Sequence, residues 1–208
     1  PEVMFGAPIY PASAGIAPIR FWRDFVTKHA DVLGSLCEFS TIPENPDYDS
    51  AYRGQRCYTL AVLYAGDAAE GEKLVEPLRN LGPKAADFSG IMPYATVRTL
   101  FDALMPTGAH RCYWKSHLLP RLTDEMMEEG LQNAVGNPSD WSISSFWGFG
   151  GAVARVPAEA TAFGSRDFGW MYSLDSVWER PEDDDKVRGY TRRAWEKFRR
   201  HAMGGRCT

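Results

Sequence analysis

The sequence lacks the features that identify several large classes of protein. It has only four cysteines and four histidines, and none of them is arranged as C-x-x-C or H-E-x-x-H. We therefore expect neither a metal site nor a redox dithiol. No apolar run reaches the roughly 18 residues that a membrane span requires, and no charged-then-apolar leader begins the chain. We expect no membrane partner and a cytoplasmic location.

Net positive charge and nucleotide-binding motifs are also missing. The 23 Lys and Arg residues against 27 Asp and Glu residues leave a formal net charge of −4. That sign disfavours nucleic acid as a partner, because phosphate contact requires a basic face. The chain has no G-x-G-x-x-G after a strand, no Walker loop, no G-x-S-x-G and no assignable catalytic triad. From its residues alone the chain is expected to be a binding surface.

Strand and helix patterns alternate along all 208 residues. The apolar periodicity predicts strands at 2–10 (an edge strand), 36–42, 56–64, 110–117, 141–149 and 168–178, and a further β-like stretch at 152–156 after a glycine-rich turn. It predicts helices at 14–30, 67–82 with a disturbance at Pro77, 94–105, 123–136 and 181–202. Strands that follow one another without a helix form antiparallel pairs. We therefore expect an α+β fold, an antiparallel β-sheet with helices packed on one face, whose two βαββ-like halves suggest a duplicated ferredoxin-like domain.

Alternation within 170–178 separates a bulky apolar face from a small, mixed one. The even positions, from Trp170 to Trp178, are of the kind that packs under helices. The odd positions include Met171, Ser173 and Asp175, which would make a plausible floor for a ligand pocket. An ordinary half-exposed strand with Asp175 in solvent explains the same pattern.

Two other strands carry candidate ligand contacts. Ser145 and Trp147 share one face of the 141–149 segment, where an aromatic side chain could be a stacking platform or part of the core. Tyr113 and Lys115 emerge on one side of the 110–117 strand. They could orient a polar substrate, or they could form a solvated edge.

Several motifs, in a fixed order and spacing, carry a resemblance to a known family. They are Tyr113-Trp114-Lys115-Ser116, the stretch 150–157, the stretch 160–163 with Arg166-Asp167 and a strand closing at Trp178, together with 64–67, 77–83 and 92–94. Together they resemble the substrate-binding domain of FAD-linked oxidases related to berberine bridge enzyme, of the vanillyl-alcohol oxidase type. The resemblance covers essentially the whole chain.

The resemblance implies a division of labour between two modules. Residues 1–208 would be a substrate-binding (cap) domain whose sheet covers the flavin ring. The flavin-binding module, absent from this chain, would hold FAD and be a partner of this domain, so no cofactor-binding residue is expected here. In the family, an oxidised C–H bond of a small-molecule substrate passes a hydride to the flavin. The fragment by itself would be inactive.

The resemblance also places the candidate site. Some members of the family carry Glu or Gln at the position that corresponds to Ser173, which cannot serve as a base. Asp175, on the same face, is the substitute candidate for the catalytic residue, provided that burial raises its pKa. The expected substrate contacts are Tyr113, Lys115, Ser145, Trp147, Met171 and Ser173. The alternative is a non-enzymatic ligand-binding or dimerisation module, since a bare sheet face also predicts a homodimer.

Overall fold

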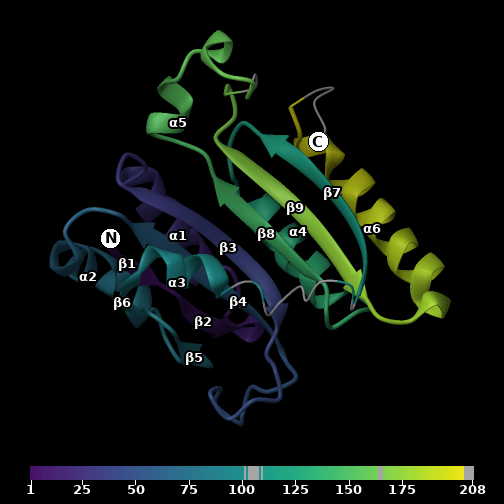
Figure 1. Cartoon of the computed structure of the whole chain (residues 1–208). Coiled ribbons are helices and arrows are strands. Elements are labelled where there is room, and N and C mark those ends of the chain that lie inside the picture. The colour runs from purple at the N-terminus through teal and green to yellow at the C-terminus, as the bar shows by residue number, and fades with distance from the viewer. Residues whose placement is uncertain (101, 103–107, 109, 164–165, 204–208) are drawn as a thin grey trace.

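The computed structural model describes residues 1–100, 102, 108, 110–163 and 166–203. Within this part of the chain one sheet is flanked by helices (Figure 1). The strands are β1 (Glu2–Gly6), β2 (Pro8–Pro11), β3 (Leu33–Thr41), β4 (Arg56–Tyr64), β5 (Ala86–Asp87), β6 (Gly90–Pro93), β7 (Arg111–Leu119), β8 (Ile143–Gly148) and β9 (Trp170–Trp178). The α-helices are α1 (Ala17–Lys28), α2 (Ala68–Val75), α3 (Tyr94–Thr99), α4 (Asp124–Val135), α5 (Ala152–Arg155) and α6 (Asp184–Phe198).

The described strands form one antiparallel sheet in the order β5-β2-β4-β3-β8-β9-β7. β1 continues the line of β2 along β4 and also pairs with β6. The α+β class expected from the sequence is therefore confirmed. The placement of residues 2–10 at the sheet edge is wrong, because β5 and β6 pair with β2 and β1 on their outer side. At two and four residues, those outer strands are too short to give a periodic pattern.

The chain repeats one order of elements, β-α-β-β-α, in its two halves. In the first half β3 and β4 follow α1, and in the second β8 and β9 follow α4. The sheet order is β2-β4-β3 in one half and β8-β9-β7 in the other, so the last strand of each half lies in the middle of its triplet. The halves join where β3 pairs with β8. This arrangement agrees with the duplication suggested by the sequence.

Local signals set the helix ends. α2 begins where the Asp67 carboxylate accepts a hydrogen bond from the Glu70 backbone N–H, and it changes to a 3₁₀ turn at residues 76–80, which contain Pro77. α4 begins with the Thr123 hydroxyl as its cap. α1 begins at Ala17 rather than at 14, because a 3₁₀ turn and Gly15, at a φ of 69°, precede it. These ends agree with the sequence-based prediction to within a few residues.

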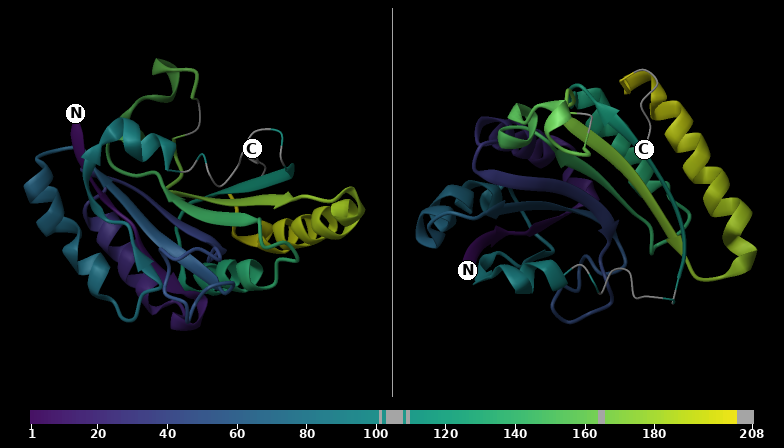
Figure 2. Two further views of the ribbon diagram at one scale, coloured as in Figure 1. Left: turned by 60° about the horizontal axis from the view of Figure 1, so that its bottom comes forward. Right: turned by 45° about the horizontal axis from the view of Figure 1, so that its top comes forward.

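The main core lies between the sheet and the helices α1, α2, α4 and α6 (Figure 2). It is rich in aromatic side chains that are fully buried, among them Trp22, Tyr58, Phe146, Tyr172 and Phe198. These come from helices and strands of both halves, so the halves share one core. Burial of such large rings removes a large apolar area from water and so stabilises the fold.

The opposite face of the sheet is only partly covered by helix. α3 packs there through Val97, which joins Phe5 and Ala61 in a smaller apolar cluster over β1 and β4. Figure 2 shows α3 on the side opposite α1, α4 and α6. The helix expected at 94–105 is described as far as Thr99, and most of the remainder lies outside the described residues. We call this second side the open face.

The glycine-rich segment after β8 differs from the prediction. The β-like stretch expected at 152–156 is the short helix α5. Gly151, at a φ of 55°, turns the chain there, and a Cβ atom at this position would lie 2.2 Å from the Ala30 carbonyl oxygen. The alternating side chains of 152–156 fit a strand equally well. The backbone turn at Gly151 therefore decided that a helix follows here rather than a strand.

Candidate functional site

One line of polar side chains crosses the open face from strand to strand. Directly opposed residues of antiparallel strands point to the same side of the sheet, so register alone defines this line. From β4 to β7 its members are Thr59, Glu38, Ser145, Ser173 and Ser116, each paired with the next. We call it the polar row. Ser145, at its centre, is only 1% exposed.

An apolar line runs beside the polar row, two residues further along each strand. It contains Ala61, Leu36, Trp147, Met171 and Leu118, again paired in register. Trp147 is 37% exposed, so part of its side chain is accessible to a ligand. The open face therefore presents an aromatic surface next to hydroxyl groups, which suits a flat ligand with polar substituents.

Two carboxylates flank the central strand β8. Glu38, on β3, is 8% exposed, and among the described residues none donates a hydrogen bond or forms an ion pair with its side chain. Burial, reinforced by the charge of Asp175, raises the pKa of Glu38 to about 7. Burial also raises the pKa of Asp175, while a hydrogen bond donated by the Ser173 hydroxyl opposes that shift. Both acids are tuned towards neutral pH, where a proton acceptor works best.

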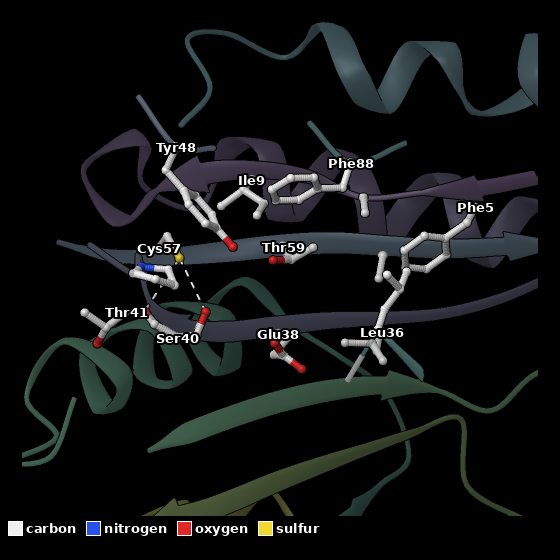
Figure 3. Close-up of a pocket in the computed structure, with 14 residues that line it drawn as sticks. Phe5, Ile9, Leu36, Glu38, Ser40, Thr41, Tyr48, Cys57, Thr59 and Phe88 are labelled. Carbon is white, nitrogen blue, oxygen red and sulfur yellow. Dashed lines mark hydrogen bonds between the residues drawn. The ribbon is translucent and has the colours of Figure 1, made fainter. Parts of the chain in front are cut away.

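A cavity of about 260 Å³ lies over β2, β4 and β3, and Glu38 lines it. Figure 3 shows Leu36, Glu38 and Ser40 projecting from β3, with Tyr48 and Phe88 on the far side of β4. A second cavity of about 310 Å³ shares Leu36 with the first and extends to Trp147. The two hollows have Phe5, Leu36 and Ala61 in common, so they lie side by side on the open face.

Five of the predicted site residues meet on the open face. Ser145 and Ser173 belong to the polar row, Trp147 and Met171 to the apolar line, and Asp175 lies one pair beyond Ser173 on β9. The parity assigned to residues 170–178 is thus correct, since the even positions Trp170, Tyr172 and Leu174 lie in the core. The substrate-binding and catalytic roles of these residues stay predictions.

The structure places Tyr113 and Lys115 on the other face, so their grouping with the other five is wrong. In the register of β7 with β9 they oppose Ser176 and Leu174, which point towards the helices. Lys115 Nζ lies 3.8 Å from the centre of the Trp195 ring in α6. The Tyr113 hydroxyl accepts a hydrogen bond from Arg192, also in α6. Both side chains attach α6 to the sheet edge.

Sequence reasoning missed Glu38. The signal was available: a single acid stands in the strand 33–41, alternating with Leu36 and Ser40. Alternation along this strand places Glu38 on one face with these two neighbours, as it does for the residues of 170–178. Only the pairing of β3 with β8 shows that this face is the one that carries Ser145 and Ser173.

The described residues contain no cluster of three or more His, Cys, Asp or Glu side chains suited to a metal ion. No described helix has both the length and the apolar character needed to cross a membrane.

Comparison with known proteins gives matches at the level of structure. No protein-family model matches the sequence, and no curated protein matches it either. BBE-like #28 from Arabidopsis thaliana superposes with a TM-score of 0.76 at 14% identity, over 98% of this chain and 44% of that protein. GilR in complex with pregilvocarcin, an oxidoreductase of gilvocarcin biosynthesis, gives 0.72 at 19% identity over 99% and 45%. Berberine bridge enzyme from Eschscholzia californica gives 0.71 at 14% identity over 98% and 41%.

These matches establish the fold. The chain has the fold of a domain of berberine bridge enzyme-like oxidoreductases, as its sequence motifs predicted. It spans less than half of the length of each solved structure, so the activity of a whole enzyme is a separate question. Among the described strand residues of the open face none is Lys, Arg or His. This face could cover a flat ring, but its strands supply no cation for the phosphates of FAD.

Proposed function

We propose that this chain is the substrate-binding domain of a flavin-dependent oxidoreductase that oxidises a C–H bond or alcohol of a small molecule. One observation carries the proposal: an antiparallel sheet backed by helices carries a polar row, an apolar line with Trp147 and two acids of raised pKa on its open face, which helix covers only in part. The shared fold of berberine bridge enzyme-like proteins supports the same assignment. The flavin-binding module would be the partner that meets this face.

In this function the chain positions the substrate. The exposed part of the Trp147 side chain and the side chain of Met171 support an apolar or planar part of the molecule. The hydroxyls of Ser145 and Ser173 lie on the same face and are the proposed contacts for its polar groups, with Ser145 almost fully buried and Ser173 8% exposed. FAD, held mainly by the partner module, would supply the electron acceptor for the hydride. The domain contributes orientation and exclusion of water, and without the partner it would be inactive.

Asp175 is the proposed proton acceptor. FAD, when bound by the partner module, would accept the hydride from the C–H bond of a substrate alcohol, and the carboxylate of Asp175 would take the O–H proton, so that a carbonyl forms. Burial raises the pKa of Asp175, which makes the carboxylate a stronger base than an exposed aspartate. The hydrogen bond from Ser173 holds the carboxylate in place on β9.

The test of the function uses this chain joined to a berberine bridge enzyme-like flavin module. The chain mixed with FAD alone is expected to leave the flavin free. The joined protein is expected to purify with yellow flavin, and the colour should bleach when a substrate is added without oxygen. A joined protein that folds but never retains flavin would contradict the proposal.

The role of Asp175 is tested in the joined protein that carries FAD. Asp175→Asn is expected to lower kcat by roughly 10²- to 10⁴-fold, because it removes the proton acceptor while leaving the shape of the site unchanged. Asp140→Asn, at a carboxylate that is largely exposed near β8, serves as the matched control. Unchanged turnover in the Asp175→Asn variant would show that Asp175 is not the proton acceptor.

A further inference from the structure

The 260 Å³ cavity combines apolar walls with a single carboxylate, that of Glu38, among its described lining residues. Its walls are formed by apolar and aromatic side chains, namely Phe5, Ile9, Leu36, Tyr48 and Phe88 (Figure 3). A cavity of about 150 Å³ already accommodates benzene. This one therefore has room for a single ring with a short side chain. Glu38 is the one carboxylate among the described residues that line it.

Glu38 has no counter-charge in the part of the chain that the structure describes. No Lys, Arg or His is found among the described lining residues. The ionisable groups whose charges act on Glu38 are Asp175 on β9, Cys57 on β4, Tyr48 in the loop after β3, and Cys37, its neighbour on β3, which points into the main core. Each of these is neutral or negative at neutral pH, so none can compensate a buried carboxylate.

We propose that this cavity binds an organic amine, with its ammonium group at the Glu38 carboxylate and its apolar part against Phe5, Phe88 and Tyr48. An ammonium group supplies both the missing charge and the missing hydrogen-bond donors. The aromatic walls favour a cation and bury the hydrocarbon part at the same time. That this amine belongs to the oxidised substrate rests on the proposed function, whereas the binding itself does not.

Other occupants fit this site less well. A neutral ligand would leave the carboxylate buried and unpaired, and an anion would be repelled by Glu38 and Asp175 together. A divalent cation prefers six or more oxygen ligands. The cavity offers it the single carboxylate of Glu38, with the hydroxyls of Ser40, Thr41, Tyr48 and Thr59, among its described lining. The combination of one buried acid with aromatic walls is therefore selective for an amine with an apolar body.

The binding should depend on pH in a defined direction. Because the pKa of Glu38 is raised to about 7, much of the carboxyl group is protonated below that pH in the free protein. An ammonium ion prefers the ionised form, so affinity for the amine should rise as the pH increases from about 6 to about 8. Binding near neutral pH should also release protons to the solvent.

The experiment uses the 208-residue chain and two probes of nearly equal shape, benzylamine and benzyl alcohol. Binding is followed by ¹H–¹⁵N NMR, with calorimetry in buffers of different ionisation enthalpy to count protons. Benzylamine is expected to bind roughly 10- to 100-fold more tightly than benzyl alcohol at about pH 8. The shifted amides should cluster around Phe5, Leu36, Glu38 and Phe88.

Variants separate the charge from the shape of the cavity. Glu38→Gln should remove the preference for the amine and the pH dependence while leaving the binding of benzyl alcohol unchanged. Glu44→Gln, at an exposed residue in the neighbouring loop, should behave like the parent protein. The spectrum of each free variant shows whether it is folded. Equal binding of both probes, or unchanged amine binding in a folded Glu38→Gln protein, would overturn the proposal.

The amine-binding experiment is independent of the test of the oxidoreductase function. The amine titration needs no flavin and no partner module, so it can fail while the joined protein still binds FAD. In the loaded enzyme the two roles also separate. Glu38→Gln should raise KM for an amine substrate more than it lowers kcat, whereas Asp175→Asn should act mainly on kcat.

Discussion

Replacing Glu38 with glutamine should stabilise the protein at high pH and leave its stability nearly unchanged at low pH. The pKa of this carboxyl group is about 7 in the folded chain and close to its ordinary value of 4.5 when unfolded. Between those pH values the folded state keeps a proton that the unfolded state has released, so the free energy of unfolding falls as the pH rises. At 1.36 kcal/mol per pKa unit, the loss above pH 7 is about 3 kcal/mol. Glutamine avoids this loss because it cannot ionise.

The assay is urea unfolding of the parent chain and of Glu38→Gln at several pH values from about 4 to about 8. The two free energies should be similar below pH 4.5, and the variant should exceed the parent by about 3 kcal/mol above pH 7. For a chain of this length that corresponds to a rise of about 6–12 °C in Tm. Glu44→Gln is the control and should show no such pH-dependent gap. A constant difference across the range, or a variant less stable than the parent at high pH, would refute the assignment of a buried, unpaired acid.

Three further predictions concern other parts of the fold. Burial disfavours ionised Asp87, but hydrogen bonds from Ser89, Lys84 and Arg79 outweigh this effect and lower the pKa of Asp87 to about 2. Asp87→Asn should therefore lower the free energy of unfolding by about 2 kcal/mol at neutral pH. The difference between parent and variant should disappear as the pH falls from about 4 towards 2. Gly130→Ala in α4 should lower the free energy of unfolding by about 1–3 kcal/mol in the same assay, because the new Cβ would lie 2.5 Å from the Phe146 ring. Gly189→Ala in α6 is the control. Its Cβ would meet only the flexible end of Arg193, so this variant should be neutral or stabilising. The isolated chain should self-associate through its open face, and Trp147→Ser should weaken this association in analytical ultracentrifugation; a monomer at all concentrations would count against it.

Much of the fold was predictable because its signals are local. Strand alternation around Tyr172 marked which side chains are buried, and the caps at Asp67 and Thr123 marked where helices begin. Absence of a helix between paired strands implied antiparallel pairing, which the whole sheet shows. The signal failed where it was too short, at β5 and β6, and where a glycine turn overrode side-chain alternation before α5.

The candidate site was predictable only within single strands. Periodicity shows which residues of one strand share a face, and it correctly grouped Met171, Ser173 and Asp175. It cannot show which face of one strand continues onto the next, because that depends on pairing register between distant segments. For this reason Tyr113 and Lys115 were grouped with the wrong face.

The amino-acid sequence by itself determined the class of the fold, the alternation of buried and exposed positions and the motifs that resemble a flavoenzyme domain, because each of these depends on residues close together in the chain. Tertiary structure alone decided that Glu38 stands in register with Ser145 and Ser173, and that no described cation neutralises it. The physical reason is that a pKa and a binding surface depend on what is near in space, and the segments that meet here are separated by more than a hundred residues.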